Sequence, residues 1–156
     1  MTDDLLTPDE WRFYTRHGQT RHDRVVARGL HAEYGENNTS AHNHVLGAGG
    51  EYVIARRLGI VWPTDTGPDG HQPDVGGWHV RTSEGAARLI LRDCDPDGLY
   101  VAVARIHYMR FRICGWCDTT TIDRTRHLAT PDRTRPPCAL IPMRLWTPWE
   151  QRPSLV

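Results

Sequence analysis

The feature that most constrains the fold is a helical segment followed by a series of short strands. Residues Ala41–Leu58 carry apolar and small side chains at spacings of three and four, and Gly59 is a typical residue to end a helix. Short apolar stretches follow, separated by turn-forming residues: Ile60–Trp62, Gln72–Val75, Trp78–Thr82, Leu89–Arg92, Leu99–Ile106 and Phe111–Trp116. This order predicts an α/β domain with a central mixed β-sheet and flanking helices.

A further helix is predicted near the N-terminus. Thr7 is a favourable N-cap, Pro8 suits the first helical position, and the acidic residues that follow favour the positive end of the helix dipole. We expect this helix to begin at Pro8 and to end by Gly35, with Gly18 as a point at which it could break. The polar residues Glu36–Ser40 then connect it to the second helix.

Length and composition indicate one domain. A chain of 156 residues can bury a core without disulfide staples. We divide it into an N-terminal helical extension (1–40), a core (41–118) and an Arg- and Pro-rich C-terminal segment (119–156). The C-terminal segment is expected to wrap the sheet, with Ile141, Leu145 and Trp146 as its anchors.

The sequence also favours a cytoplasmic location. Its acidic start is unlike a signal peptide, and no apolar run is long enough to span a membrane, so no membrane partner is expected. The 4 cysteines are then expected to be reduced thiols.

The cationic charge is unusual in kind, not in amount. Net charge is zero, yet all 19 basic residues are arginine. A biased genome explains such a composition, but arginine is also the better planar binder of phosphate. An excess of positive charge exists only locally, between Thr119 and Val156, where Arg outnumbers the acidic residues.

Glu51 lies on the helical face that also carries Ile54, Ala55 and Leu58. A carboxylate that faces a core must be paired, hydrogen-bonded or bound to a metal ion. The sequence leaves three interpretations: a metal ligand, an ordinary buried Glu–Arg pair, or a helix face that is solvated at that turn.

A β-hairpin is predicted between Gln72 and Thr82. Gly76-Gly77 suits a two-residue turn whose central residues need positive φ, and it places Val75 opposite Trp78. Because side chains alternate along a strand, one face then presents an amide, an acid, an imidazole and a guanidinium: Gln72, Asp74, His79 and Arg81. The structural alternative is the polar outer face of a surface hairpin.

Together, these residues resemble the PD-(D/E)xK nuclease superfamily. The matches are Glu51 within Gly49-Gly50-Glu51, the pair Pro73-Asp74, and the triplet His79-Val80-Arg81. The turn after Pro73-Asp74 and the later Gly115-Trp116 are similar to small phage-type members. The resemblance covers roughly His44 to Trp116 and implies a restriction-endonuclease-like core.

The resemblance implies a metal-dependent nuclease, a hydrolase that cuts by attack of water, and DNA is expected as its partner in preference to RNA. Glu51, Asp74 and the backbone carbonyl of Val80 would bind Mg²⁺ or Mn²⁺, and Arg81 would contact the phosphate. His79 would be an auxiliary ligand or a proton carrier. The arginines assigned to DNA contact are Arg56, Arg57, Arg124 and Arg126. A homodimer is also compatible with the resemblance.

Two departures from the superfamily motif leave open whether the chain is an active nuclease. His79 stands where the superfamily has an acid, and Arg81 replaces a lysine and cannot act as a base. The alternative is an inactive protein of nuclease fold, related to phages or mobile elements, that binds DNA or a protein partner.

Cys114 and Cys117 offer half of a zinc site, but without a second pair at usable spacing zinc is not expected.

Overall fold

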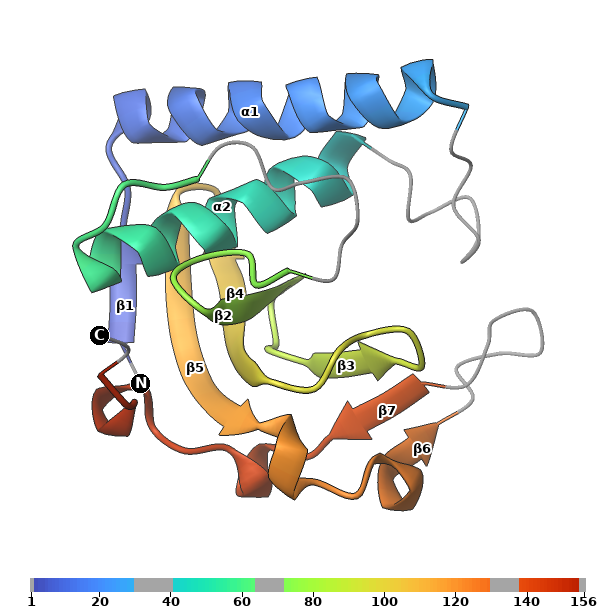
Figure 1. The fold of residues 1–156 in the computed structure, drawn as a ribbon. Helices are drawn as coiled ribbons and strands as arrows, with labels where there is room; N and C mark the ends of the chain where they lie inside the picture. The colour runs from blue at the N-terminus through green and yellow to red at the C-terminus, as the bar shows by residue number, and fades with distance from the viewer. Residues whose placement is uncertain (1, 30–40, 64–71, 130–137, 155–156) are drawn as a thin grey trace.

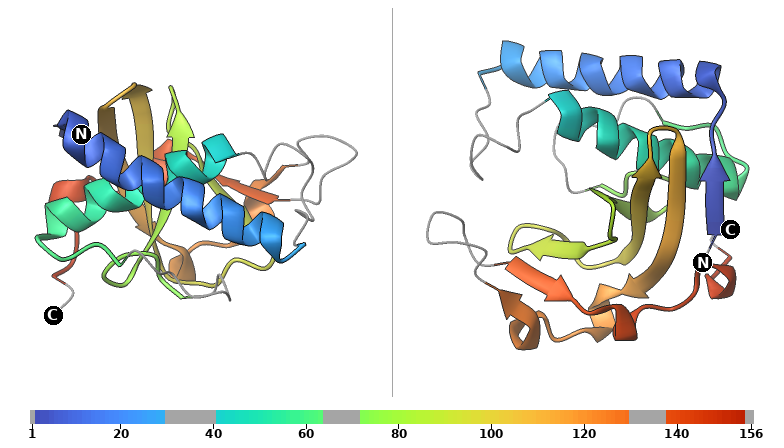
Figure 2. Two further views of the ribbon diagram at one scale, coloured as in Figure 1. Left: turned by 90° about the horizontal axis from the view of Figure 1, so that it is seen from above. Right: turned by 180° about the vertical axis from the view of Figure 1, so that it is seen from behind.

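The computed structural model describes residues 2–29, 41–63, 72–129 and 138–154. Helix α1 (Pro8–Ala27) lies on helix α2 (Ala41–Leu58), and α2 covers one face of a four-stranded sheet (Figure 1). A three-stranded sheet lies on the side away from the helices, as the rear view also shows (Figure 2). The predicted α/β class with a mixed sheet and flanking helices is confirmed.

The four-stranded sheet has the order β1-β5-β4-β2, built from β1 (Thr2–Leu5), β2 (Trp78–Glu84), β4 (Leu99–His107) and β5 (Arg110–Asp118). Strands β2 and β4 are parallel, whereas β1 and β4 are each antiparallel to β5. The second sheet has the order β3-β7-β6, built from β3 (Leu89–Arg92), β6 (Leu128–Ala129) and β7 (Cys138–Ile141). Strand β2 therefore has its only ladder partner, within the described ranges, in β4.

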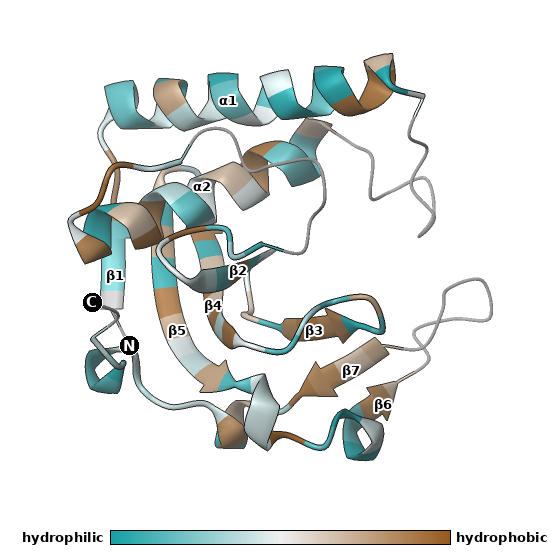
Figure 3. Cartoon of the chain, viewed as in Figure 1, coloured by the Kyte–Doolittle hydropathy of each residue, from teal (hydrophilic) through white to brown (hydrophobic). Residues whose placement is uncertain are grey.

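Two apolar cores lie on the two faces of the four-stranded sheet. The first core, between the helices and the sheet, includes Ile54, Val80 and Phe111. The second core, between the two sheets, includes Tyr100 and Ile141. The hydropathy colouring follows this division, with apolar strands in the small sheet and a mostly polar outer helix (Figure 3).

Helix α2 has the predicted bounds, and α1 continues through Gly18 without a break. A side chain at Gly18 would meet the Cα of Val45 at 2.5 Å, so this glycine permits close packing of the two helices. Helix α1 ends at Ala27, earlier than expected. The part of the prediction beyond Gly29, including the Glu36–Ser40 connector, lies outside the described residues.

The strand predictions are partly confirmed. Strand β3 has the predicted bounds, and the other central strands are somewhat longer than expected. Two predictions are wrong: Ile60–Trp62 is irregular, and Gln72–Val75 contributes only an isolated bridge at Val75. Pairing of β1 with β5 joins segments more than a hundred positions apart, and no local pattern signals it. Of the expected C-terminal anchors, Ile141 is buried, Trp146 packs against the second core and Leu145 is 41% exposed.

No helix among residues 2–29, 41–63, 72–129 and 138–154 has the length and apolar character that crossing a membrane requires.

Candidate metal centre at the free edge of the sheet

The Gly76-Gly77 turn brings Asp74 to the start of strand β2. Both glycines have positive φ, 52° and 86°, as the predicted two-residue turn requires. Val75 bridges to Trp78, and the Asp74 N–H donates to the carbonyl of Trp78 at 2.8 Å. This bridge is not extended into a ladder, and the Asp74 side chain turns toward β2, where Oδ2 accepts from the N–H of Val80.

Asp74 and Val80 meet at the free edge of β2. The N–H of Val80 donates to Oδ2 of Asp74 at 2.7 Å, and the Val80 carbonyl accepts from Nη1 of Arg81 at 3.4 Å. Since the N–H and C=O of one strand residue point the same way, both groups of Val80 face away from β4. The Val80 side chain meanwhile packs into the first core. This edge therefore presents a carboxylate and a backbone carbonyl side by side.

Glu51 approaches this edge from α2 and is held by α1. It is only 7% exposed. Arg21 donates to both of its carboxylate oxygens, at 2.7 and 2.6 Å, and the indole N–H of Trp62 donates to Oε2 at 3.2 Å. The buried Glu–Arg pair, one of the three interpretations open from the sequence, is thus present.

The two carboxylates are electrostatically strained. Burial raises the pKa of Glu51; the bonds from Arg21 oppose this, and the nearby charge of Asp74 raises the pKa further. Burial likewise raises the pKa of Asp74 against the hydrogen bond from Val80 and the charges of Arg81 and Arg21. In both cases burial outweighs the neighbouring donors and cations, so the charged form of each carboxylate is disfavoured.

His79 and Arg81 share a face of β2, as predicted, but that face belongs to the second core. The imidazole of His79 stacks on Tyr100 with ring centroids 4.6 Å apart, and the residue is 4% exposed. Burial lowers its pKa, which favours the neutral ring of a packed core residue. Within the part of the chain that the structure describes, His79 is joined to neither Asp74 nor Glu51 by a hydrogen bond or ion pair.

Arg81 has two partners near the site. Its guanidinium lies over the ring of Tyr100, 5.1 Å from the centroid, and its Nη2 pairs with Oδ2 of Asp95 at 2.9 Å. Asp95 in turn accepts from the N–H of Arg92 at 2.9 Å. The cation is thus fixed close to Asp74, whose pKa it lowers.

The oxygen atoms at this edge suit a hard divalent cation, but Arg21 competes for two of them. Glu51, Asp74 and the Val80 carbonyl offer oxygen atoms of the kind that Mg²⁺ and Mn²⁺ bind. The raised pKa values of both carboxylates indicate a site that added positive charge would stabilise. Arg21 occupies both oxygens of Glu51 and would have to release at least one of them. Across the described ranges, no three His, Cys, Asp or Glu side chains are grouped to hold a metal ion.

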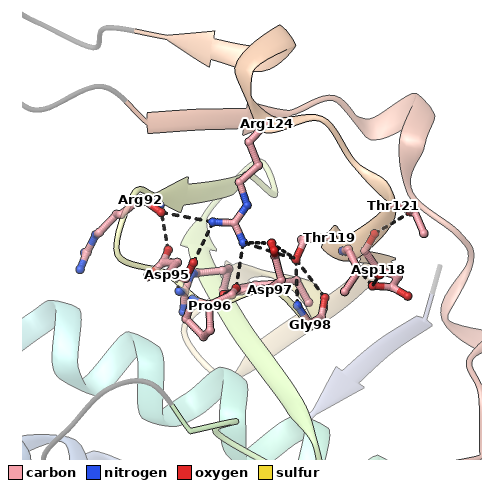
Figure 4. A network of polar contacts seen from close by, with 12 residues as sticks. Arg92, Asp95, Pro96, Asp97, Gly98, Asp118, Thr119, Thr121 and Arg124 are labelled. Carbon is pink, nitrogen blue, oxygen red and sulfur yellow. Dashed lines mark hydrogen bonds and ion pairs between the residues drawn. The ribbon is translucent and has the colours of Figure 1, made fainter.

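The four arginines assigned to DNA contact are each engaged with acids of the same chain. Arg56 pairs with Glu10 at 3.2 Å, Arg57 with Asp4 at 2.6 Å and Arg126 with Asp123 at 3.1 Å. Arg124 pairs with Asp97 at 2.6 Å and also donates to the carbonyls of Asp95 and Pro96 (Figure 4). Arg124 therefore braces the turn before β4, and the structure brings none of the four to Asp74 or Glu51.

Sequence reasoning missed Arg21 and Asp95. Arg21 lies thirty positions before its partner, and nothing in the local sequence distinguishes it from the other arginines of α1. Asp95 stands in an Asp-Pro-Asp-Gly stretch that reads as a turn. A buried carboxylate requires a cationic partner, but spacing alone cannot say which arginine provides it.

The two cysteines weighed as half of a zinc site are both free thiols. Burial raises the pKa of Cys117 to about 12 and also raises that of Cys114. Cys117 packs in the second core. Cys117 thus has the apolar setting of a small core residue.

Comparison of the chain with protein-family models, with curated proteins and with solved structures gave no match.

Proposed function

We propose that this chain is a metal-dependent phosphodiesterase of the PD-(D/E)xK type that acts on DNA. The observation that carries the proposal is the buried carboxylate of Glu51 and the partly buried carboxylate of Asp74, beside the edge-facing carbonyl of Val80. Burial and the nearby charge of Asp74 raise the pKa of Glu51, and burial raises that of Asp74. Carboxylates with raised pKa values that lie near one another are typical of functional sites.

In this proposal each side chain has a defined role. Glu51, Asp74 and the Val80 carbonyl would hold Mg²⁺ or Mn²⁺, which when bound acidifies a water molecule and offsets charge on the phosphate. Arg81 would bind the scissile phosphate, because its guanidinium stays charged and the pair with Asp95 fixes its direction. His79 is stacked on Tyr100, and the proposed reaction needs no proton from it.

Arg21 neutralises Glu51 whenever no metal ion is bound. On metal binding it would give up one or both oxygens. Its side chain is 17% exposed, so the pair with Glu51 is largely shielded from solvent. The proposal thus makes Arg21 a competitor of the metal ion for Glu51.

A second candidate is an inactive protein of nuclease fold that binds nucleic acid. Two observations favour it: Arg21 already fills both oxygens of Glu51, and position 79 offers a stacked imidazole where the superfamily has an acid. In that case the Arg21–Glu51 pair would be a permanent link between α1 and α2.

Cleavage of labelled single-stranded and duplex DNA in Mg²⁺ and in Mn²⁺ distinguishes the two candidates. The variants are Asp74→Asn and Glu51→Gln, which keep size and hydrogen bonding but remove charge. Asp9→Asn is the matched control, because the Asp9 side chain is 91% exposed and lies at the start of α1. We expect cleavage by the wild type and by Asp9→Asn, and a loss of at least about a hundredfold in the other two.

Failure of the wild-type protein to cut DNA with either metal would overturn the nuclease proposal. Binding of the same DNA in a gel shift, without cleavage, would then support the inactive binding protein.

A further inference from the structure

Two histidines meet where the start of α2 lies against the second half of α1 (Figure 1). The ring centroids of His22 and His44 are 5.4 Å apart, with an angle of 53° between the ring planes. Both side chains are half-buried. Each helix thus contributes one imidazole to the same point of the contact between the helices.

A glycine one turn away fixes how closely the two helix backbones approach. Gly18 lies four positions before His22, which places both residues on one face of α1. A Cβ at Gly18 would lie 2.5 Å from the Cα of Val45 and 2.9 Å from the carbonyl oxygen of His44. Any side chain here would push the helices apart, so the glycine keeps the two imidazoles within reach of one ligand.

One nitrogen of this pair of rings is buried without a partner. Nδ1 of His22 has no hydrogen bond within the part of the chain that the structure describes. Such atoms are uncommon in native proteins, because leaving a buried polar atom unpaired costs free energy. By contrast, His42 on the same helix as His44 pairs with Glu84 at 3.2 Å.

The spacing and the type of these groups suit a borderline divalent metal ion. Zn²⁺ binds imidazole nitrogen at about 2.0–2.1 Å in tetrahedral geometry, which puts the centres of two coordinated rings about 5 Å apart. Imidazole suits zinc, copper and nickel, whereas Mg²⁺ favours carboxylate and carbonyl oxygen. Water would complete the coordination, because no third His, Cys, Asp or Glu joins a metal-binding group in the described ranges.

We propose that His22 and His44 bind one Zn²⁺ ion between α1 and α2. We call this pair of residues the histidine clip. The ion would satisfy the unpaired imidazole and link the two helices where Arg21, next to His22, is already paired with Glu51. The inference is independent of the proposed function, because its ligands include neither Glu51 nor Asp74.

The test is the titration of metal-free protein with Zn²⁺ in competition with a chromophoric zinc chelator. His22→Gln and His44→Gln each remove one ligand and keep a polar side chain. The matched controls are His17→Gln on α1 and His42→Gln on α2, whose side chain is 51% exposed. Long-range ¹H–¹⁵N spectra of the histidine rings in the wild type test the same site without any substitution.

We expect the wild type to bind one Zn²⁺ ion, with ring shifts confined to two of its 9 histidines. Zn²⁺ at about a hundred times its Kd should raise the Tm by about 5–10 °C. His22→Gln and His44→Gln should each weaken zinc binding by at least about tenfold, and the two controls by less than about twofold.

Three results would overturn the histidine clip. The first is unchanged zinc affinity in both His22→Gln and His44→Gln, or no zinc binding by the wild type. The second is an equal loss in the two controls, with ring shifts spread over many histidines, as scattered surface binding would give. The third is loss of zinc binding in Asp74→Asn, which would place the ion at the carboxylates.

The two proposals can fail separately, because the nuclease is tested with Mg²⁺ and Mn²⁺. Zinc binding that depends on His22 and His44, together with no DNA cleavage, removes the nuclease and keeps the histidine clip. Cleavage that is lost in Asp74→Asn, together with no zinc binding, keeps the nuclease and overturns the clip.

Discussion

Arg21 of α1 donates to both carboxylate oxygens of Glu51 of α2, at 2.7 and 2.6 Å, and this pair joins the two helices beside the free edge of the sheet. Both side chains are largely shielded, with 17% and 10% of their surfaces exposed. A charge pair in such a setting is strong only while both partners are present, because either one alone would be a buried, uncompensated ion. A metal ion at Glu51 would therefore have to displace Arg21 from at least one of these oxygens.

Replacement of Arg21 by Gln should destabilise the protein strongly. Among the residues that the structure describes, Glu51 would then keep only the hydrogen bond from Trp62, and loss of one partner of a buried pair costs about 3–5 kcal/mol. Urea unfolding at pH 7 measures the change in the free energy of unfolding. Arg12→Gln is the control, since Arg12 and its partner Asp9 are 67% and 91% exposed and should contribute little.

The same Arg21→Gln variant reports on metal binding. If Glu51 can take a divalent cation, Mg²⁺ or Mn²⁺ should raise the Tm of this variant more than that of the wild type, because no guanidinium competes for the oxygens. An equal metal-induced rise in both proteins, or none in either, argues against a cation at Glu51.

Asp74→Asn should stabilise the protein at neutral pH while it abolishes the proposed activity. Because the pKa of Asp74 is raised in the folded state, the unfolded state loses its proton first as pH rises above the usual value of 3.8. Stability is therefore lost as pH rises through the folded-state pKa, and a neutral Asn avoids that loss. We expect a gain of about 1 kcal/mol at pH 7, or a few degrees in Tm. A lower Tm than wild type at pH 7 would contradict the electrostatic strain inferred for the site.

His79→Phe should make the protein less sensitive to acid. The pKa of His79 is lowered by burial and by Arg81, so the unfolded state takes up a proton first as pH falls below the usual value of 6.5. Stability is lost over that range in the wild type, and Phe cannot contribute to the loss. The measurement is the difference in unfolding free energy between pH 7 and pH 5. An unchanged difference in His79→Phe would show that His79 does not titrate as a buried core ring.

Gly50→Ala should destabilise the contact between α2 and β2. A Cβ at Gly50 would lie 1.9 Å from Oγ1 and 3.0 Å from Cβ of Thr82, so helix or strand must shift, at a cost of about 1–3 kcal/mol. Gly47→Ala in the same helix is the matched control: nothing lies within 4 Å of its added Cβ, and Ala favours the helix by about 0.5–1 kcal/mol. Thermal unfolding should thus move in opposite directions, and equal shifts would exclude close packing at Gly50 as the cause.

Much of the local structure could be predicted from the sequence because it depends on neighbouring residues. Apolar spacing and Gly59 determine the extent of α2, and Gly76-Gly77 determines the turn that places Asp74 beside β2. Strand alternation likewise predicts that His79 and Arg81 share a face. These features follow from dihedral preferences and side-chain periodicity, which act within a few residues.

Only the tertiary structure decided which partners these groups have. His79 stacks on Tyr100 instead of joining the carboxylates, since the second core lies on that side of β2, whereas Arg81 on the same face also donates to the carbonyl of Val80. Arg21 reaches Glu51 because α1 packs on α2, and the sequence offers many arginines for a carboxylate that needs one. Burial makes a charged partner necessary, but the identity of that partner depends on how distant segments pack, and a local pattern carries no information about that.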